Sequence, residues 1–366
     1  MTTVCVVTPN LVRGGVERVV LRLIDGLDRS RFEPNLVLFS DNGGGFPRPT
    51  GVPVEVLDTT SLRGHPRVLA REWRRRPPDV VLAHTSGASV VSLVARRLAR
   101  GRFPVVAVLH RPLGLEFDRK DTVMRIGSRL LLPSAAAVAA PSRGTAADIA
   151  AFLHWPSDRV RVLLNPIVDA SIALDAAEPV EHPFFEPGLR VVTSAGWLTP
   201  LKDFATLVRA FARLVPHDAS LRLLILGEGR ERSALERLVE DLGIDERVSL
   251  PGLVANPFAY IGRSAIFALS STSESLSNVL VEALALGTPV VSTDCVAGPR
   301  EVLRGGEFGR LVPVGDDAAL ASAIQSTLAD PPDAESLRRR ANDFGAPAVA
   351  AYEELIDECV AAASIR

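Results

Sequence analysis

The sequence predicts an α/β protein built from two tandem, doubly wound, Rossmann-like domains that face a cleft. Three observations lead to this fold class. The chain has 366 residues, which is more than one hydrophobic core usually serves. Unbroken apolar runs of strand length alternate with segments of helical periodicity, as in parallel sheets that helices cover on both faces. The alternation stops once, in a proline-rich segment, and then starts again.

The first domain is expected to span residues 1–180. It opens with the strand VCVVTP, and the helix that follows carries apolar residues at helical spacing in GGVERVVLRLIDGL. Further expected strands are PNLVLFS, VPVEVLD, DVVLAH, FPVVAVLH, AAAVAAPS and RVRVLLNP, with a helix over ASVVSLVARRLAR. Such a series of strands and helices is typical of a parallel sheet.

An interdomain linker is expected over Glu178 to Arg190, where three prolines and two adjacent phenylalanines interrupt the pattern. The second domain, 188–346, then repeats it. Expected strands are RVVTSAG, LRLLILG, RVSLPG, AIFALSS and PVVST, and expected helices are FATLVRAFARLV, RSALERLVEDLG, NVLVEALALG and DDAALASAIQSTLAD. The last segment, 347–366, is expected to form a long helix that packs back on the first domain. Ligands of doubly wound domains bind beyond the carboxyl ends of the strands.

Composition narrows the class of protein. The three cysteines are far apart and show no metal-ligand spacing, so we expect no metal site and a reducing, cytoplasmic compartment. No signal peptide and no membrane-spanning run is predicted. Residues 1–180 hold 24 Lys and Arg against 17 Asp and Glu, whereas residues 181–366 hold 17 against 26. A basic first half is consistent with an anionic partner, although solubility alone explains the asymmetry equally well.

Two loops that follow strands suit phosphate binding. TPNLVRGGVER places Gly14 and Gly15 at the start of a helix, where backbone N–H groups favour an anion. A tight turn is the plain alternative, and neither a GxGxxG nor a P-loop pattern is present. Lys202, one of only two lysines, lies in the loop SAGWLTPLKDF and is a candidate phosphate clamp or a solvated surface residue.

The strongest local signal is the stretch ESLSNVLVE, in which Glu274 and Glu282 flank the expected start of a helix. A glutamate in this region can accept hydrogen bonds from hydroxyl groups of a ribose or sugar, or it can simply complement the helix dipole. His110 ends an expected strand, and Gly227 follows another in LILGEGRERSALE. Each feature alone has a structural explanation, but their order after successive strands favours a shared nucleotide site.

Taken together, these stretches resemble the family-four retaining glycosyltransferases of GT-B architecture. The resemblance rests on GGVERVV, HRP, LLNPIVD, GWLTPLKDF, LGEGRERSALE, ESLSNVLVEALALGTPVVSTDCVAGPREVL and GRLVPVGD, and covers nearly the whole chain. It implies an enzyme that needs neither metal nor cofactor and moves a sugar from a nucleoside diphosphate to an acceptor. It does not imply nucleic-acid binding.

The resemblance also assigns roles. Glu282 would hold the ribose, Glu274 would lie beside the transferred sugar, and His110 would contact the sugar or acceptor. Lys202 and Gly15 would approach the diphosphate. The remaining donor contacts would come from the loop and helix start, at Ser275, Leu276, Ser277, Asn278 and Val279. Glu274, His110 and Lys202 are thus the expected catalytic residues.

Two positions depart from the family pattern. Trp197 stands where the family usually has an arginine that shares the diphosphate, and Ser275 stands where glycine is common. Losing one charge-assisted contact costs about 1.5–3 kcal/mol, and Arg13, Arg143 and Arg300 are candidates to replace the charge. The departures keep a weakened homologue that binds a sugar nucleotide or partner open as an alternative. A nucleotide-sugar epimerase of the same architecture is a third.

The resemblance favours a UDP-sugar donor, because LLNPIVD and STDCVAGPRE are similar to bacterial members that use UDP-N-acetylhexosamines. The acceptor is expected to be a glycan, a lipid-linked glycan or a small molecule. Residues 63–79 carry six arginines, and Val68, Leu69 and Trp73 could form an apolar stripe on a helix there. That helix would either lie on an anionic membrane at the inner face or pack on the first sheet.

Overall fold

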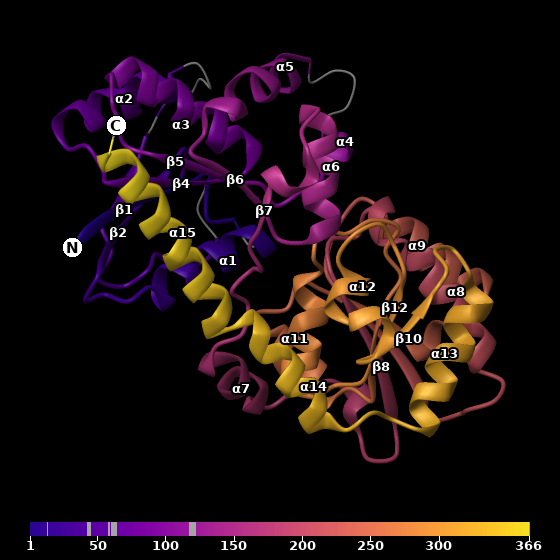
Figure 1. Ribbon diagram of the computed structural model, residues 1–366. Coiled ribbons are helices and arrows are strands. Elements are labelled where there is room, and N and C mark those ends of the chain that lie inside the picture. The colour runs from indigo at the N-terminus through magenta and orange to yellow at the C-terminus, as the bar shows by residue number, and fades with distance from the viewer. Residues whose placement is uncertain (13, 42–44, 58, 60–63, 117–121, 366) are drawn as a thin grey trace. The chain divides into compact units, whose positions relative to one another are not determined.

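The computed structural model describes residues 1–12, 14–41, 45–57, 59, 64–116 and 122–365. The chain forms two compact units (Figure 1). Unit 1 comprises Met1–Ile167 and Ala346–Arg366, and unit 2 comprises Val168–Gly345. Each unit is a parallel sheet covered by helices, as the unbroken apolar strands predict.

Unit 1 contains a seven-stranded sheet in the order β3-β2-β1-β4-β5-β6-β7. All of its pairs are parallel. The strands are β1 (Thr2–Thr8), β2 (Phe32–Leu38), β3 (Val54–Val56), β4 (Val80–His84), β5 (Val105–Val108), β6 (Ala137–Ala140) and β7 (Arg161–Val162). The order reverses between β1 and β4, which is where doubly wound sheets bind ligands.

Helices cover both faces of this sheet. They are α1 (Gly15–Gly26), α2 (His65–Arg75), α3 (Ser86–Ala99), α4 (Leu113–Glu116), α5 (Thr122–Leu131), α6 (Arg143–Leu153) and α15 (Ala346–Ser364). Residues of α1 and α15 share one core cluster with alternate strand residues such as Val6 and Leu82. Residues of α2, α3 and α6 share the other, with the intervening residues such as Val7 and Ala83. Successive strand residues therefore face opposite layers.

Unit 2 contains a six-stranded parallel sheet in the order β10-β9-β8-β11-β12-β13. Its strands are β8 (Arg190–Ala195), β9 (Leu221–Leu226), β10 (Val248–Gly252), β11 (Ile266–Leu269), β12 (Val290–Thr293) and β13 (Arg310–Val312). Its helices are α7 (Ala170–Ala177), α8 (Phe204–Leu214), α9 (Arg232–Asp241), α10 (Pro257–Arg263), α11 (Asn278–Leu286), α12 (Pro299–Val302), α13 (Asp317–Ala329) and α14 (Ala334–Ala341).

The boundary between the units differs from the expected one at 180. The chain passes into unit 2 after Ile167, and Glu178–Arg190 lies inside that unit rather than between two domains. Helix α7 is held there because Asn256 donates a hydrogen bond to the carbonyl of Asp175 at 2.6 Å, and Arg263 donates one to Ala176 at 2.7 Å. Of the three prolines in the expected linker, Pro183 opens a short 3-10 turn, Pro183–Phe185.

The C-terminal helix α15 belongs to unit 1, the unit on which the sequence predicted that it packs. Arg31 bonds Glu353 at 3.1 Å, and the backbone N–H of Asp28 donates to the same carboxylate at 2.8 Å. Tyr352, Leu355 and Ile356 of α15 are at most 2% exposed and share a core cluster with strand residues of the sheet. Helix α15 thus closes one face of the unit 1 core.

Candidate functional site

In unit 2, the loop before α11 is held in a conformation that exposes a helix start. Ser277, the residue before α11, adopts a left-handed backbone with φ 72°. Its side chain does not cap the helix, and its buried Oγ has no hydrogen-bond partner among the described residues. Gly298 packs against the backbone of Leu276 so closely that a Cβ there would lie 2.8 Å from it. The Ser277 hydroxyl is therefore without a partner among the described residues, at a helix start whose positive potential suits an anion.

Lys202 and Glu274 meet beside this helix start. Nζ of Lys202 lies 2.5 Å from Oε1 of Glu274, and Ser271 donates a 2.7 Å hydrogen bond to the same oxygen. The side chains are 21% and 10% exposed, respectively. The Lys202 loop is anchored because Ser270 donates to the Lys202 carbonyl at 2.9 Å. The structure thus joins two residues, 72 positions apart, that the sequence assigned to one site.

Trp197 follows β8 in the same loop and is 45% exposed. The neighbouring Gly196 has φ 155°, and a Cβ there would lie 3.2 Å from Cε of Lys202. The stem of Lys202 therefore crosses the backbone next to Trp197. An arginine at position 197 would have solvent access, which is a condition for its reaching a ligand from this loop.

Glu282 is buried at 4% exposure within α11, one helical turn after its first residue. Ser275, Asn278 and Val279 are partly buried, whereas Leu276 is buried at 1%. The leucine side chain belongs to the core, so only its backbone could face a ligand. The loop and the start of α11 bring the expected donor contacts from Glu274 to Glu282 into one short region, and Lys202 meets Glu274 from the loop after β8.

Gly227 has a structural reason to be glycine. Its φ is 148°, and a Cβ would lie 1.9 Å from the carbonyl oxygen of Gly196. Glu228, beside it, is engaged by Arg232 at 2.8 Å. The backbone N–H of Leu198 donates to the carbonyl of Glu228 at 2.8 Å, and this bond joins the loop after β9 to the loop that carries Trp197.

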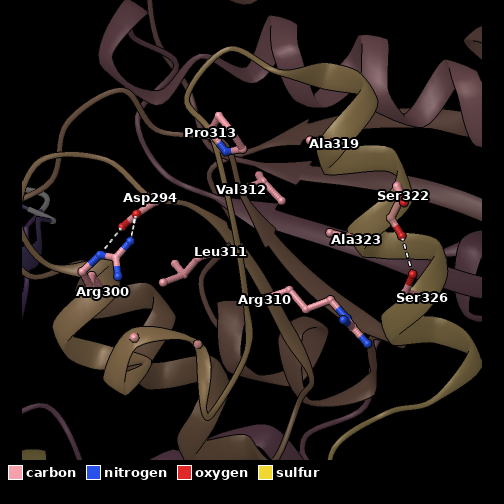
Figure 2. Close-up of a pocket in the computed structure, with 12 residues that line it drawn as sticks. Asp294, Arg300, Arg310, Leu311, Val312, Pro313, Ala319, Ser322, Ala323 and Ser326 are labelled. Carbon is pink, nitrogen blue, oxygen red and sulfur yellow. Dashed lines mark hydrogen bonds and ion pairs between the residues drawn. The ribbon is translucent and has the colours of Figure 1, made fainter.

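A cavity of about 890 Å³ opens elsewhere in unit 2, beside β13 and α13 (Figure 2). None of Lys202, Glu274 and Glu282 lines it. Figure 2 shows Arg300 directed at Asp294, with Nε of Arg300 3.1 Å from Oδ1 of Asp294. The charge of Arg300 is already balanced there, which weakens its candidacy as the replacement for the missing arginine.

In unit 1, Gly14 and Gly15 start helix α1 directly after β1 and its loop, as predicted from the sequence. A Cβ on Gly14 would lie 2.4 Å from Oε2 of Glu17. Burial raises the pKa of Glu17, against the nearby charge of Arg111. Arg143 starts α6 and is exposed, and Arg13 lies outside the described residues.

His110 is at the carboxyl end of β5, and the structure pairs it with a residue that sequence reasoning missed. Nε2 of His110 lies 2.9 Å from Nδ1 of His84, which ends β4, and both rings are buried. Burial lowers the pKa of His110 to about 4 and that of His84 well below its usual value. Both rings are therefore neutral near pH 7. The signal that could have found His84 is its position at a strand end, the same as that of His110.

The predicted membrane stripe on α2 is wrong. Leu69 is fully buried and Trp73 is 4% exposed, and the Trp73 ring packs edge-on against Phe103 with centroids 5.2 Å apart. Only Val68 of the three stripe residues remains 36% exposed. The alternative of a helix packed on its own sheet is therefore the correct one, because burying these side chains stabilises the core more than leaving them in water.

No group of three or more His, Cys, Asp and Glu side chains capable of holding a metal occurs within the part of the chain that the structure describes. Cys295 lies close enough to Glu274 and Lys202 to feel both charges. Burial raises the pKa of its thiol to about 12, and the Glu274 carboxylate acts in the same direction. Cys295 is consequently a neutral thiol and a poor nucleophile.

Comparison with solved structures defines the class of fold. The crystal structure of Anabaena HepE in complex with UDP aligns with a TM-score of 0.76 and 22% identity, over 99% of this chain and all of that one. The architecture is GT-B, with two Rossmann-like α/β domains.

Sequence comparison defines the family. Residues 13–170 match the family described as Glycosyltransferase Family 4, and residues 189–330 match glycosyl transferases group 1. The lipopolysaccharide core biosynthesis glycosyltransferase LpsE of Rhizobium meliloti is 30% identical over 91% of this chain and 89% of its own. A Campylobacter jejuni N-acetylgalactosaminyltransferase that acts on a diphospho-undecaprenol-linked sugar is 28% identical over 88% of both chains. The chain belongs to the family-four glycosyltransferases and is a glycosyltransferase.

Proposed function

We propose that this enzyme transfers a sugar, with retention of anomeric configuration and without a metal ion, from a UDP-sugar to a glycan, lipid-linked or small-molecule acceptor. The observation that carries the proposal is the ion pair of Lys202 and Glu274 beside the start of α11. A sugar diphosphate can use all three of these elements. The cation pairs with the phosphate charge, the carboxylate accepts hydrogen bonds from sugar hydroxyls, and the helix start donates N–H groups to phosphate oxygens.

The proposed reaction breaks the bond between the anomeric carbon and the β-phosphate oxygen. The acceptor oxygen bonds to the same carbon from the same face, and its proton passes to the departing phosphate. Negative charge grows on the leaving diphosphate, where the ammonium of Lys202 and the N–H groups at the start of α11 stabilise it. Glu274 orients the sugar, and Glu282 holds the ribose.

The choice of UDP is supported by the UDP complex of Anabaena HepE. An N-acetylhexosamine and a lipid-linked acceptor are supported by the Campylobacter relative, whose name specifies N-acetylgalactosamine and a diphospho-undecaprenol acceptor. The test is a thermal-shift screen with UDP, GDP and ADP sugars, followed by product analysis. We expect UDP-sugars to stabilise the protein against thermal unfolding. We also expect the donor to be consumed only when an acceptor is present. Donor binding without turnover would favour a weakened homologue, and alteration of the sugar without acceptor an epimerase.

A membrane-bound acceptor would require a lipid-facing surface, and α5 fits one better than α2. Val123, Ile126 and Leu130, at helical spacing, are 83%, 52% and 69% exposed. Arg125 and Arg129 are exposed on the same helix. The opposite side of α5 packs on α3, where Gly127 lies against Val90.

We propose that this α5 surface, defined as Val123, Ile126 and Leu130 with the two arginines, rests on an anionic bilayer. Three aliphatic side chains are too few for the roughly 800 Å² per partner of a stable protein interface, whereas shallow insertion beside arginines suits anionic lipid. The described helices include none with the length and hydropathy needed to cross a bilayer.

A further inference from the structure

Polar residues gather at the carboxyl ends of three strands in unit 1, under helix α15. Thr8, His84 and His110 each come two positions after a strand residue that faces the layer of α1 and α15, so they are expected to lie on the same side of the sheet. Each is at most 5% exposed. Strands β1 and β4 are adjacent, with Val7 opposite Ala83, so Thr8 and His84 are neighbours. The ring of Tyr352, from α15, stacks beside His84 with centroids 6.4 Å apart. Of this group, only His110 has a role expected from the family resemblance, in contact with the sugar or acceptor.

The two histidine rings are held by one hydrogen bond between neutral partners. Their planes differ by 17°, and Nδ1 of His84 lies 2.9 Å from Nε2 of His110. Because burial lowers the pKa of both rings, one ring must donate its N–H and the other must accept it. The bond therefore couples the tautomers of the two residues.

The ring nitrogen of His110 that points away from this bond is the one left for a ligand. Nδ1 of His110 is buried and has no hydrogen-bond partner among the described residues. When Nδ1 carries the proton and donates it to a ligand, Nε2 of His110 keeps a lone pair. Nδ1–H of His84 is then the donor of the 2.9 Å bond.

We propose that His84 is a positioning residue of the transferase: it donates Nδ1–H to Nε2 of His110 and so fixes both the tautomer and the plane of that ring. His110 then offers Nδ1–H, as a neutral donor, to a hydroxyl of the sugar or acceptor. The proposal rests on the proposed function in assigning His110 to substrate contact. In metal sites, partners that orient a histidine ring through such a bond change activity by about 10- to 100-fold, and an effect of that order is expected here.

Two substitutions separate the hydrogen bond from the volume of the ring. His84→Asn places an amide nitrogen near the position of Nδ1 and keeps a donor, whereas His84→Leu fills the space without one. The first is expected to retain kcat within about threefold, and the second to lower kcat at least tenfold with little change in donor KM. Thermal unfolding of both variants checks that the fold persists. Equal losses of kcat in both variants, or wild-type kcat in the leucine variant, would overturn the proposal.

The tautomer can be read without any substrate. Nitrogen-15 NMR of the six histidines, with His110→Asn to assign the signals, is expected to show His110 protonated at Nδ1 and His84 protonated at Nδ1. In His84→Leu the Nδ1 preference of His110 should be lost, and in His84→Asn it should remain. A wild-type His110 protonated at Nε2 contradicts the proposal. An enzyme inactive with every donor, but with the expected tautomers, would instead refute the proposed function.

Discussion

Lys202 Nζ lies 2.5 Å from Glu274 Oε1, so the cation of the candidate donor site is neutralised before any ligand arrives. Both side chains are largely buried, and such a pair is costly to break from one side. A bound diphosphate would offer Lys202 a second anion, while the sugar hydroxyls would donate to Glu274. We therefore expect Lys202 and Glu274 to stay in contact when the donor binds, with the diphosphate as an additional partner of Lys202 and the sugar hydroxyls as additional partners of Glu274.

Replacing Lys202 by methionine should weaken UDP-sugar binding and lower the stability of unit 2, because Glu274 loses its cation, while the fold persists. The variant loses one charge-assisted contact to phosphate, about 1.5–3 kcal/mol or 10- to 150-fold in Kd, and leaves Glu274 without its cation. Calorimetry with a UDP-sugar measures the loss. Arg213→Met is the matched control, because Arg213 pairs with Asp317 on the exposed side of α8. Unchanged affinity in the Lys202 variant would remove it from the site.

Glu282→Gln should lower the affinity for UDP, because the variant loses the charged acceptor for the ribose hydroxyls. The wild type is expected to lose about tenfold in affinity for a nucleotide that lacks a ribose hydroxyl, since hydrogen bonds to a charged group contribute about 1.5–3 kcal/mol. In the variant, normal and deoxy nucleotides should bind more nearly alike. Competition calorimetry with UDP and its 2′- and 3′-deoxy forms tests this. An undiminished preference for the intact ribose would assign ribose binding to another residue.

Trp197→Arg should tighten nucleotide binding. The position is 45% exposed and lies in the loop crossed by Lys202, so a guanidinium there can add a bidentate phosphate contact. An increase of about tenfold in affinity for UDP is expected from one such contact. Trp197→Lys is the control, because it adds a positive charge without the bidentate geometry of a guanidinium group. If the folded arginine variant binds no more tightly, Trp197 does not occupy the family's arginine position, or another residue has replaced its charge.

The sequence predicted the sheets well because parallel strands buried on both faces are unbroken apolar runs. Strand β13 was missed: it has only three residues, Arg310–Val312, and an exposed arginine at its start. Helix α7 was missed because it lies where the chain was expected to connect two domains. Its place in unit 2 depends on hydrogen bonds from Asn256 and Arg263, which are far away in sequence.

For the candidate site, the sequence indicates a contiguous motif, whereas the pairing of its side chains depends on how loops and strands are placed in three dimensions. The loop from Glu274 to Glu282 could be predicted from one stretch of sequence. The engagement of Arg300 by Asp294 and of His110 by His84 could not, because both depend on how loops and strands are placed in three dimensions. Trp73 was misassigned because a basic helix with an apolar stripe looks the same whether the stripe faces lipid or core.

Acid should destabilise unit 1 through its buried histidines. The pKa of His110 is about 4 in the folded state and about 6.5 when unfolded. Between these values the unfolded chain binds a proton that the folded ring does not, so the free energy of unfolding falls as the pH falls from about 6.5 to 4 and changes no further below. The full loss for this group is roughly 3 kcal/mol, and His84 acts in the same direction.

Urea denaturation from pH 7 to 4.5 measures this dependence. His110→Asn should show a smaller loss of stability on acidification than the wild type. His154→Asn is the control, because it removes an exposed histidine at the end of α6 and leaves the buried pair intact. If acidification destabilises all three proteins equally, the buried rings are not the groups that take up the protons.

The α5 surface should control association with anionic lipid. Changing Val123, Ile126 and Leu130 to serine removes the exposed aliphatic groups, and full burial of each would contribute about 1.5–3 kcal/mol. Shallow insertion recovers only part of that, so a loss of at least tenfold in partitioning to anionic vesicles is expected. Changing Arg125 and Arg129 to glutamine should weaken binding chiefly at low salt, since headgroup attraction is screened. Leu174→Ser, at a 72% exposed leucine of α7, is the control for a solvent-facing aliphatic residue.

Co-sedimentation with anionic and neutral vesicles at two salt concentrations separates these effects. Equal, negligible binding of the wild type to both vesicles would reject the membrane surface and favour a soluble acceptor, and concentration-dependent self-association abolished by the serine variant would assign α5 to a contact between copies of the chain.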